Sequence, residues 1–250
     1  MQKTALITGG ASGIGFATCG VLGKAGYSIA LVDIDADNGA KAVSELKSAG
    51  VEACFFQTDV TDENQVNKLV RDVADCFGGI DAVVNCAGGL VGRSKIDEMT
   101  TEFYYKVMDL NMTSAMYVTR AVVPYLKEAV KKGGNPSIVN ITSLAEYSGG
   151  GPGASIYATS KAALHGFTKA MAKELIPAGV RVNAVAPGTI DTPFYDATPR
   201  ELVESWRSSI PAQRLGEPVE IANIIEFLLS DKASFMVGEV VQVNGGQMMI

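Results

Sequence analysis

The sequence predicts an α/β fold in which a doubly wound, mainly parallel sheet carries helices on both faces. Short runs rich in β-forming residues alternate with longer segments of helical pattern, about six times along the chain. Several of these runs, such as Ile29–Val32 and Ala82–Val84, are apolar throughout instead of alternating with polar residues. Strands that are covered by helices on both faces have this composition, as in a parallel sheet.

Turn and cap residues delimit the expected elements. Strands are predicted at Thr4–Thr8, Ser28–Asp33, Glu52–Gln57, Ala82–Asn85, Ser137–Thr142, Val180–Ala186 and Val240–Val243. Helices are predicted between them, for example over Ala36–Ala49 and Asp62–Phe77. The second of these helices begins at Thr61 or Asp62, both good N-cap residues, and ends at Gly78-Gly79. No linker or repeat divides the chain, so residues 1–250 are predicted to form one domain.

Composition excludes several classes of function. Apolar residues make up 47% and charged residues 19% of the 250 positions, which is typical of a globular protein with a large core. A net charge of -6 argues against nucleic acid as a partner, because phosphate backbones require a basic surface. No stretch approaches the roughly 20 apolar residues of a membrane helix, and no signal peptide is evident. The four cysteines form no Cys-x-x-Cys pair, which predicts no metal site and a reduced, cytoplasmic protein.

A glycine-rich loop follows the first predicted strand. The segment Thr8–Gly15 contains Gly9, Gly10, Gly13 and Gly15, which permit a sharp turn and a close approach of the backbone to a pyrophosphate. The N–H groups at the start of the next helix then point at that anion. A simple turn is the alternative, but the position between a strand and an apolar helix favours a nucleotide site.

The acidic residue Asp33 ends the second predicted strand, 18 residues after Gly15. A carboxylate at this distance accepts hydrogen bonds from the adenosine ribose hydroxyls and repels a 2′-phosphate. No Arg or Lys occupies Ser12, Ile34 or Asp35, where it would hold that phosphate. The pattern favours NAD over NADP, the alternative being a solvated loop aspartate.

A tyrosine and a lysine four residues apart, Tyr157 and Lys161, lie within a predicted helix. Residues at this spacing share one helix face, so both side chains can point at one reactant. A nearby ammonium stabilises the phenolate form of a tyrosine, whose free pKa is near 10, and makes it a usable acid/base group. Ser143 follows the strand that ends at Thr142, where its hydroxyl can hydrogen-bond a substrate oxygen. His165, the only histidine, is interpreted as a packed or interface residue outside the site.

In these motifs the chain resembles the short-chain dehydrogenase/reductase family, from Thr4 to Gly246. Further similar motifs are Asp59-Val60 near the adenine, Asn85-Cys86-Ala87-Gly88 in place of Asn-Asn-Ala-Gly, and Pro187-Gly188 with Thr192 near the nicotinamide. Cys86 departs from the family pattern. The resemblance implies catalytic roles for Asn111, Ser143, Tyr157 and Lys161, and cofactor contacts at Gly9, Ser12, Gly13, Ile14, Gly15, Asp33, Asp59, Val60, Asn85, Ala87, Gly88, Tyr157, Lys161, Pro187, Gly188, Ile190 and Thr192.

The resemblance also implies a mechanism and an assembly. Tyr157 would be the general acid/base, and Lys161 would lower its pKa and contact the ribose. Ser143 would position the substrate oxygen, and Asn111 would anchor a water of a proton relay. A seven-stranded Rossmann sheet and a homotetramer are further implications. Apolar faces over Phe103–Val130 and Ala162–Leu175 agree with pairing of helices between subunits.

The leading hypothesis is an NAD(H)-dependent oxidoreductase that interconverts a secondary alcohol and its ketone. The alternatives are an NADPH-dependent 3-oxoacyl thioester reductase and, in another class, a dinucleotide-sensing or scaffold protein without turnover. The segment Gly188–Gly216, with Phe194, Tyr195, Trp206 and Pro199, is interpreted as a substrate lid or a packed surface excursion. Arg93 is either a group for an anionic substrate or a solvated surface residue, and the sequence does not identify the substrate.

Overall fold

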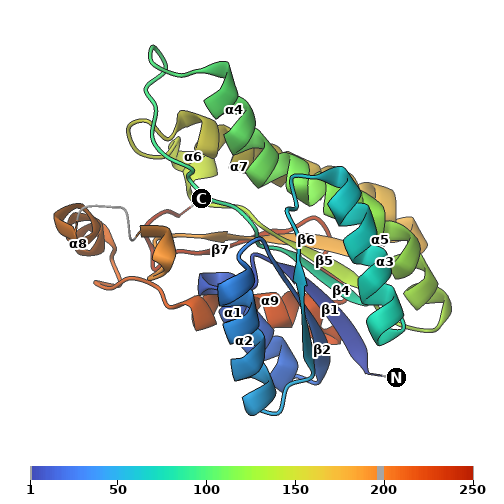
Figure 1. Ribbon diagram of the computed structural model, residues 1–250. Helices are drawn as coiled ribbons and strands as arrows, with labels where there is room; N and C mark the ends of the chain where they lie inside the picture. Colours follow the sequence, from blue (N-terminus) through green and yellow to red (C-terminus); the bar gives the residue numbers. More distant parts are fainter. Residues whose placement is uncertain (1, 196–199, 250) are drawn as a thin grey trace.

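A computed structural model describes residues 2–195 and 200–249, and its strands form one all-parallel sheet (Figure 1). The strand order is β3-β2-β1-β4-β5-β6-β7. This order confirms the predicted doubly wound α/β fold and its seven strands. Each strand begins and ends within one residue of its predicted bounds. The strands are β1 (Lys3–Thr8), β2 (Tyr27–Asp33), β3 (Ala53–Gln57), β4 (Ala82–Asn85), β5 (Ser137–Ile141), β6 (Arg181–Pro187) and β7 (Val240–Val243).

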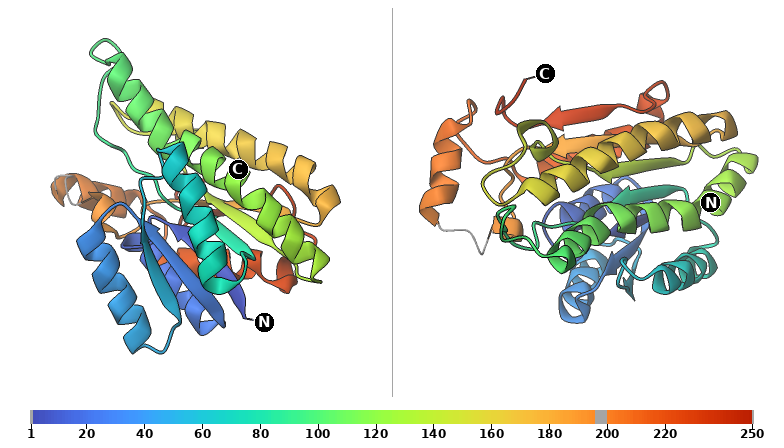
Figure 2. Two further views of the ribbon diagram at one scale, coloured as in Figure 1. Left: turned by 45° about the vertical axis from the view of Figure 1, so that its right-hand side comes forward. Right: turned by 90° about the horizontal axis from the view of Figure 1, so that it is seen from above.

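Continuous apolar strands supply two cores, one on each face of the sheet. In β1, Ala5 and Ile7 belong to one core, whereas Leu6, which points the opposite way, belongs to the other. Successive side chains of a strand alternate between faces, so a strand buried on both sides has no polar alternation. The first core is closed by α1 (Gly13–Lys24), α2 (Ala36–Ser48) and α9 (Pro218–Leu229). The second is closed by α3 (Glu63–Phe77), α5 (Ser114–Lys131) and α7 (Ser155–Leu175), which run along one face in Figure 2.

Local signals account for the ends of α3. The side chain of Asp62 accepts hydrogen bonds from the N–H groups of Asn64 and Gln65, so it is the N-cap of the helix. Gly78 ends the helix with a φ of 81°, in the left-handed region that glycine adopts without strain. Both ends were predictable because a cap depends on residues within one turn.

The apolar stretch around Asn111 departs from a regular helix. The chain forms α4 (Thr101–Met108), then a π-helical turn over Asp109–Thr113, and then α5. A π turn inserts a residue into the helical repeat and is common at functional sites. Here it turns the side chain of Asn111 inward, where it is 1% exposed. The amphipathic pattern predicts the helices but not this insertion.

The remaining elements are short. Helices α6 (Ala145–Ser148) and α8 (Arg200–Ser209) follow the carboxyl ends of β5 and β6, and 3-10 turns lie at Ile176–Ala178, Pro193–Tyr195 and Asp231–Ala233. Figure 1 shows α8 outside the sheet at that edge. Pro199, named with the predicted lid, lies outside the described residues. In the part of the chain that the structure describes, no helix is long and apolar enough to cross a membrane.

Candidate active site

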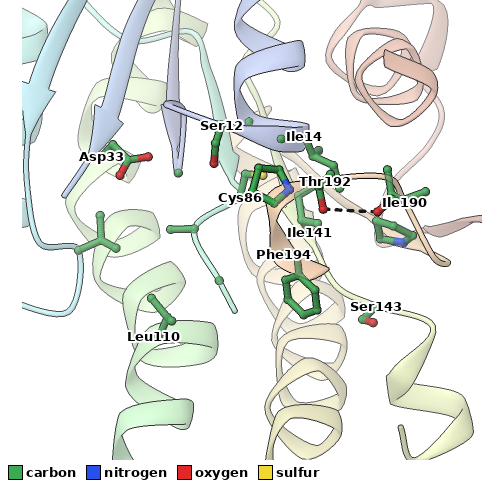
Figure 3. Close-up of a pocket in the computed structure, with 18 of the residues that line it drawn as sticks. Ser12, Ile14, Asp33, Cys86, Leu110, Ile141, Ser143, Ile190, Thr192 and Phe194 are labelled. Atoms are coloured by element: carbon green, nitrogen blue, oxygen red, sulfur yellow. Dashed lines mark hydrogen bonds between the residues drawn. The ribbon is translucent and has the colours of Figure 1, made fainter. Parts of the chain in front are cut away.

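A cavity of about 470 Å³ opens along the carboxyl ends of the strands, beside the junction of β1 and β4. Ligands of doubly wound sheets bind at this junction, because the chain connections diverge there and leave a crevice. Asp33 lies at one end of the cavity and Ser143 at the other (Figure 3). The predicted residues that line it are Gly9, Ser12, Gly13, Ile14, Gly15, Asp33, Asp59, Val60, Ala87, Gly88, Ser143, Tyr157, Lys161, Pro187, Gly188, Ile190 and Thr192.

The glycine loop lets the start of α1 face this cavity. A Cβ on Gly15 would lie 1.9 Å from the carbonyl oxygen of Gly9, so only glycine permits the contact. Gly9 has a φ of 64°, which turns the chain sharply after β1. No side-chain hydrogen bond from Ser12 caps the helix, so the amide groups of the first turn remain available to an anion. The loop therefore fits the pyrophosphate of a dinucleotide.

The cavity is lined by groups of both charges. Among the described residues that line it, the charged side chains are Asp33, Asp59 and Lys161. One oxygen of Asp33 accepts the N–H of Ala11 at 3.0 Å and the other accepts the N–H of Asp35 at 3.1 Å. These bonds fix the carboxylate at the end of β2 beside the glycine loop. The adenosine end is consequently acidic and suits hydroxyl groups better than a phosphate.

The segment after β4 forms the cavity wall between these ends. The hydroxyl oxygen of Thr8 accepts the N–H groups of Cys86 and Ala87, each at 3.1 Å. A Cβ on Gly88 would lie 2.8 Å from Asn111 Oδ1 and 2.9 Å from Lys161 Nζ. The absence of a side chain at this position brings the backbone against the lysine.

The pair predicted on one helix face, Tyr157 and Lys161, lies on α7 with both residues at the cavity wall. Lys161 Nζ is 5.9 Å from the centroid of the Tyr157 ring and donates a hydrogen bond to the carbonyl of Ile141 at 2.8 Å. Lys161 is 4% exposed, and this burial lowers its pKa to about 8. A proton on Lys161 is therefore held less tightly than on a solvated lysine.

Ser143 lies where the first cavity meets a second one. Its hydroxyl oxygen accepts the N–H of Ala145 at 3.1 Å. The second cavity, of about 200 Å³, shares Ser143, Tyr157, Gly188 and Phe194 with the first. A reactant between Ser143 and Tyr157 would thus contact both cavities, one able to hold a cofactor and the other a substrate.

Two predicted residues, Asn85 and Asn111, are not among the residues that line the cavity. Asn85 Nδ2 donates to Asn140 Oδ1 at 2.8 Å within the core. Asn111 accepts the N–H of Gly89 and donates to its carbonyl, at 3.0 and 2.9 Å. Both amides therefore support the cavity wall from behind. The relay role of Asn111 stays a prediction.

Several cavity residues have no motif that would predict them. Most of them adjoin a strand end or a predicted site residue, and that proximity is the usable signal: Val32, Ile34, Thr58, Cys86, Leu110, Ile141, Thr142, Pro193 and Phe194. Cys86, the departure from the family pattern, is among them. Burial raises the pKa of its thiol to about 12, so the group stays protonated and acts as a small apolar side chain.

A hydrogen bond joins α6, which follows Ser143, to α7, which carries Lys161. Glu146 Oε1 lies 2.9 Å from His165 Nδ1, and the Glu146 side chain is 1% exposed. Glu146 belongs to α6, directly after Ser143, and His165 lies one turn beyond Lys161 on α7. His165 is packed, as expected, and its partner could not be read from the sequence. The pair braces α6 against α7.

Comparisons with known proteins agree over almost the whole chain. A family model described as enoyl-(acyl carrier protein) reductase matches residues 9–248. The 3-oxoacyl-(acyl-carrier-protein) reductase FabG of Thermotoga maritima is 38% identical over 98% of this chain and 97% of its own length. The 2,5-dichloro-2,5-cyclohexadiene-1,4-diol dehydrogenase LinX of Sphingobium indicum is 35% identical over 98% of this chain and 95% of its own.

A solved structure supports the same relationship. The crystal structure of the NADH-dependent reductase A1-R′, responsible for alginate metabolism, superposes with a TM-score of 0.91 at 35% identity, covering 100% of this chain and 98% of that one. Fold and relatives together define an oxidoreductase that acts on CH–OH groups. The chain belongs to the short-chain dehydrogenase/reductase family.

Proposed function

We propose that this protein transfers a hydride between NAD(H) and a secondary alcohol or its ketone. The observation that carries the proposal is the arrangement of the first cavity, which has Asp33 at one end and Ser143 at the other, with Tyr157 and Lys161 in its wall. The glycine loop between the ends suits a pyrophosphate, so a dinucleotide would extend along the cavity with its reactive ring near Tyr157.

Tyr157 would act as the general acid/base. In oxidation, the substrate hydroxyl gives its proton to Tyr157 Oη, and the hydride leaves the same carbon; in reduction, both transfers run in reverse. NAD(H), when bound, supplies the hydride chemistry. Lys161, held by the carbonyl of Ile141, places a positive charge beside the phenol and stabilises its deprotonated form. The Ser143 hydroxyl would hold the substrate oxygen in line with Tyr157.

The acidic end of the cavity supports NAD over NADP. Asp33 would accept hydrogen bonds from the ribose hydroxyls, and the described lining residues place no cation beside it. The similar protein A1-R′ is an NADH-dependent reductase, which agrees with this choice. The second candidate is an NADPH-dependent 3-oxoacyl thioester reductase, favoured by the 38% identity to FabG.

The segment 188–216 would act as a substrate lid on a single 1–250 domain. Its two ends meet, because Asp191 donates to the carbonyl of Gly216 at 2.8 Å and Gly216 donates to that of Thr189 at 3.0 Å. The ring of Phe194 lies 5.9 Å from that of Tyr157. A segment whose two ends are hydrogen-bonded to each other can move as a unit, as a substrate lid does. We also propose a cytoplasmic homotetramer that needs no metal.

A cofactor assay on a panel of secondary alcohols and ketones tests the function. We expect turnover with NAD(H) that exceeds turnover with NADP(H), and a Tyr157→Phe variant slower by roughly 10²–10⁴-fold. Binding of NADH, followed by its fluorescence, should be unchanged in the variant. A preference for NADPH with 3-oxoacyl thioesters would favour the second candidate. Turnover that survives in Tyr157→Phe would exclude its role as the acid/base group.

A further inference from the structure

The second cavity, beyond Ser143 and Tyr157, has an unusual distribution of charge. At about 200 Å³ it suits a small molecule. Apolar and small residues form most of its wall: Leu90, Leu144, Ala145, Ala154, Phe194, Trp206 and several glycines. Among the described lining residues, Arg93 is the one charged side chain.

Arg93 is held in place by the glycine-rich loop between β5 and α7. Its Nη1 donates a hydrogen bond to the carbonyl of Pro152 at 2.9 Å, and the N–H of the next residue, Ser94, donates to the carbonyl of Gly153 at 3.0 Å. A Cβ on Gly153 would lie 3.0 Å from Arg93 Cβ, and one on Gly151 would lie 3.4 Å from Nη1. The glycines therefore let the two loops approach each other at Arg93, whose side chain stays exposed to solvent.

No carboxylate neutralises this arginine within the described part of the chain. The ion pairs there engage Arg120, Arg207 and Arg214, but not Arg93. A guanidinium has five N–H donors, and the bond to Pro152 uses one of them. The remaining donors suit a planar oxyanion, which a guanidinium binds through two parallel hydrogen bonds.

We propose that the substrate is a secondary alcohol or ketone that carries a carboxylate, and that Arg93 binds this carboxylate. The proposal rests on the proposed function and names the substrate class of the same site. The carbinol or carbonyl carbon lies between Ser143 and Tyr157, the intervening carbons contact the apolar wall, and the carboxylate reaches Arg93. Arg93 is solvent-exposed, so a neutral substrate leaves it hydrated at little cost, and selectivity for acids comes from the charge-assisted pair that only a carboxylate forms.

The single tryptophan of the chain, Trp206, lines this cavity and reports binding without turnover. The probes are straight-chain keto acids of graded length, each with its methyl ester, titrated against the protein in the presence of NAD. Because NAD and a ketone cannot react, the change in Trp206 fluorescence measures affinity alone. The variants are Arg93→Gln and Arg93→Lys. Arg207→Gln, an exposed arginine on α8 that does not line the cavity, is the matched control.

We expect at least one keto acid to bind the wild type about tenfold more tightly than its ester, as a charge-assisted hydrogen-bonded pair predicts. Arg93→Gln should abolish this difference and leave affinity for the ester unchanged, Arg93→Lys should retain part of it, and Arg207→Gln should retain all of it. Equal affinity for every acid and its ester in the wild type, or a preference that survives in Arg93→Gln, would overturn the proposal.

Turnover with NADH tests the carboxylate-bearing substrate separately from the proposed oxidoreductase activity. Esters or neutral ketones that are reduced as well as the acids would exclude the carboxylate and leave the oxidoreductase function intact. Acids that bind in an Arg93-dependent way without being reduced with either cofactor would keep the anion site and exclude the function.

Discussion

At the residue scale, the burial of Lys161 lowers the stability of the fold but serves the role proposed for this residue in the mechanism. Its ammonium group is almost fully buried and donates a hydrogen bond to the carbonyl of Ile141. Burial of a charge costs free energy, and the lowering of its pKa to about 8 expresses that cost. The same placement puts a cation beside the Tyr157 phenol, where the proposed mechanism requires it.

Replacing this lysine should therefore stabilise the fold. In the folded state the pKa is about 8 and in the unfolded state it is 10.5, so the unfolded chain binds more protons between these values. The penalty is complete below pH 8 and disappears as the pH rises towards 10.5. Lys161→Met should be more stable than the wild type at pH 7, by about 1 to 3 kcal/mol, and lose activity.

Urea unfolding of both proteins at pH 7 and pH 10 measures this difference. The advantage of Lys161→Met should shrink at the higher pH, when the folded wild type has lost its proton. An advantage that does not change with pH would show that repacking, not desolvation, is its cause. Lys161→Met should also leave the fold intact, as judged by circular dichroism.

Site residues differ in how far the sequence determines them. Tyr157 and Lys161 were predictable because their spacing on a helix places them on one face. The contact of Lys161 with Ile141 was not, since it joins residues 20 apart through the packing of α7 on β5. The same holds for the pair of Glu146 and His165, which depends on how α6 meets α7.

At the element scale, two of the four glycines of α1 have different structural roles. Gly15 approaches the backbone of Gly9, and a Cβ would collide with its carbonyl. A Cβ on Gly20, in the middle of the helix, would meet no atom within 4 Å. Gly15 is thus required for the close packing of the glycine loop, whereas Gly20 only lowers the stability of the helix.

Alanine at these two positions should have opposite effects. Gly15→Ala must displace the loop, so we expect weaker NADH binding by at least about tenfold and a loss of roughly 1 to 3 kcal/mol of stability. Gly20→Ala should raise stability by about 0.5 to 1 kcal/mol and leave NADH binding unchanged. Fluorescence titration and thermal unfolding measure both. Normal NADH affinity in Gly15→Ala would contradict the close approach.

Elements were predictable where local signals end them. Asp62 and Gly78 delimit α3 through contacts within one turn, and the strands follow from apolar runs. The π turn at Asp109–Thr113 was not predictable, because Asn111 inside it bonds to Gly89, 22 residues away. Long-range hydrogen bonds of this kind leave no periodic pattern in the sequence.

At the scale of the whole molecule, the proposed homotetramer has to cover exposed apolar side chains. Much of the apolar surface of α5 packs inside the chain, through residues such as Val118 and Val122. Tyr105 on α4 is 57% exposed, however, and Phe235, ahead of the edge strand β7, is fully exposed at 101%. An isolated phenylalanine at the end of a sheet suits a contact between subunits.

Light scattering should therefore give a mass four times that of one chain. Phe235→Glu should shift the population to smaller species, because a buried carboxylate without a partner destabilises an interface. Circular dichroism should show an unchanged fold in the variant, since the Phe235 side chain is fully exposed in the single chain. A wild-type monomer would exclude the assembly, and an unchanged tetramer in Phe235→Glu would place the interface elsewhere.

The sequence by itself determines the strands, most helix ends, the glycine loop and the Tyr157–Lys161 pair. Each of these depends on neighbours within a few residues or on continuous burial. Only the tertiary structure decides what those residues meet. It sets Asp33 and Ser143 at opposite ends of one cavity and closes the loop of Arg93 against Pro152. Such contacts join residues far apart in the chain, and packing, which is a property of the whole fold, determines them.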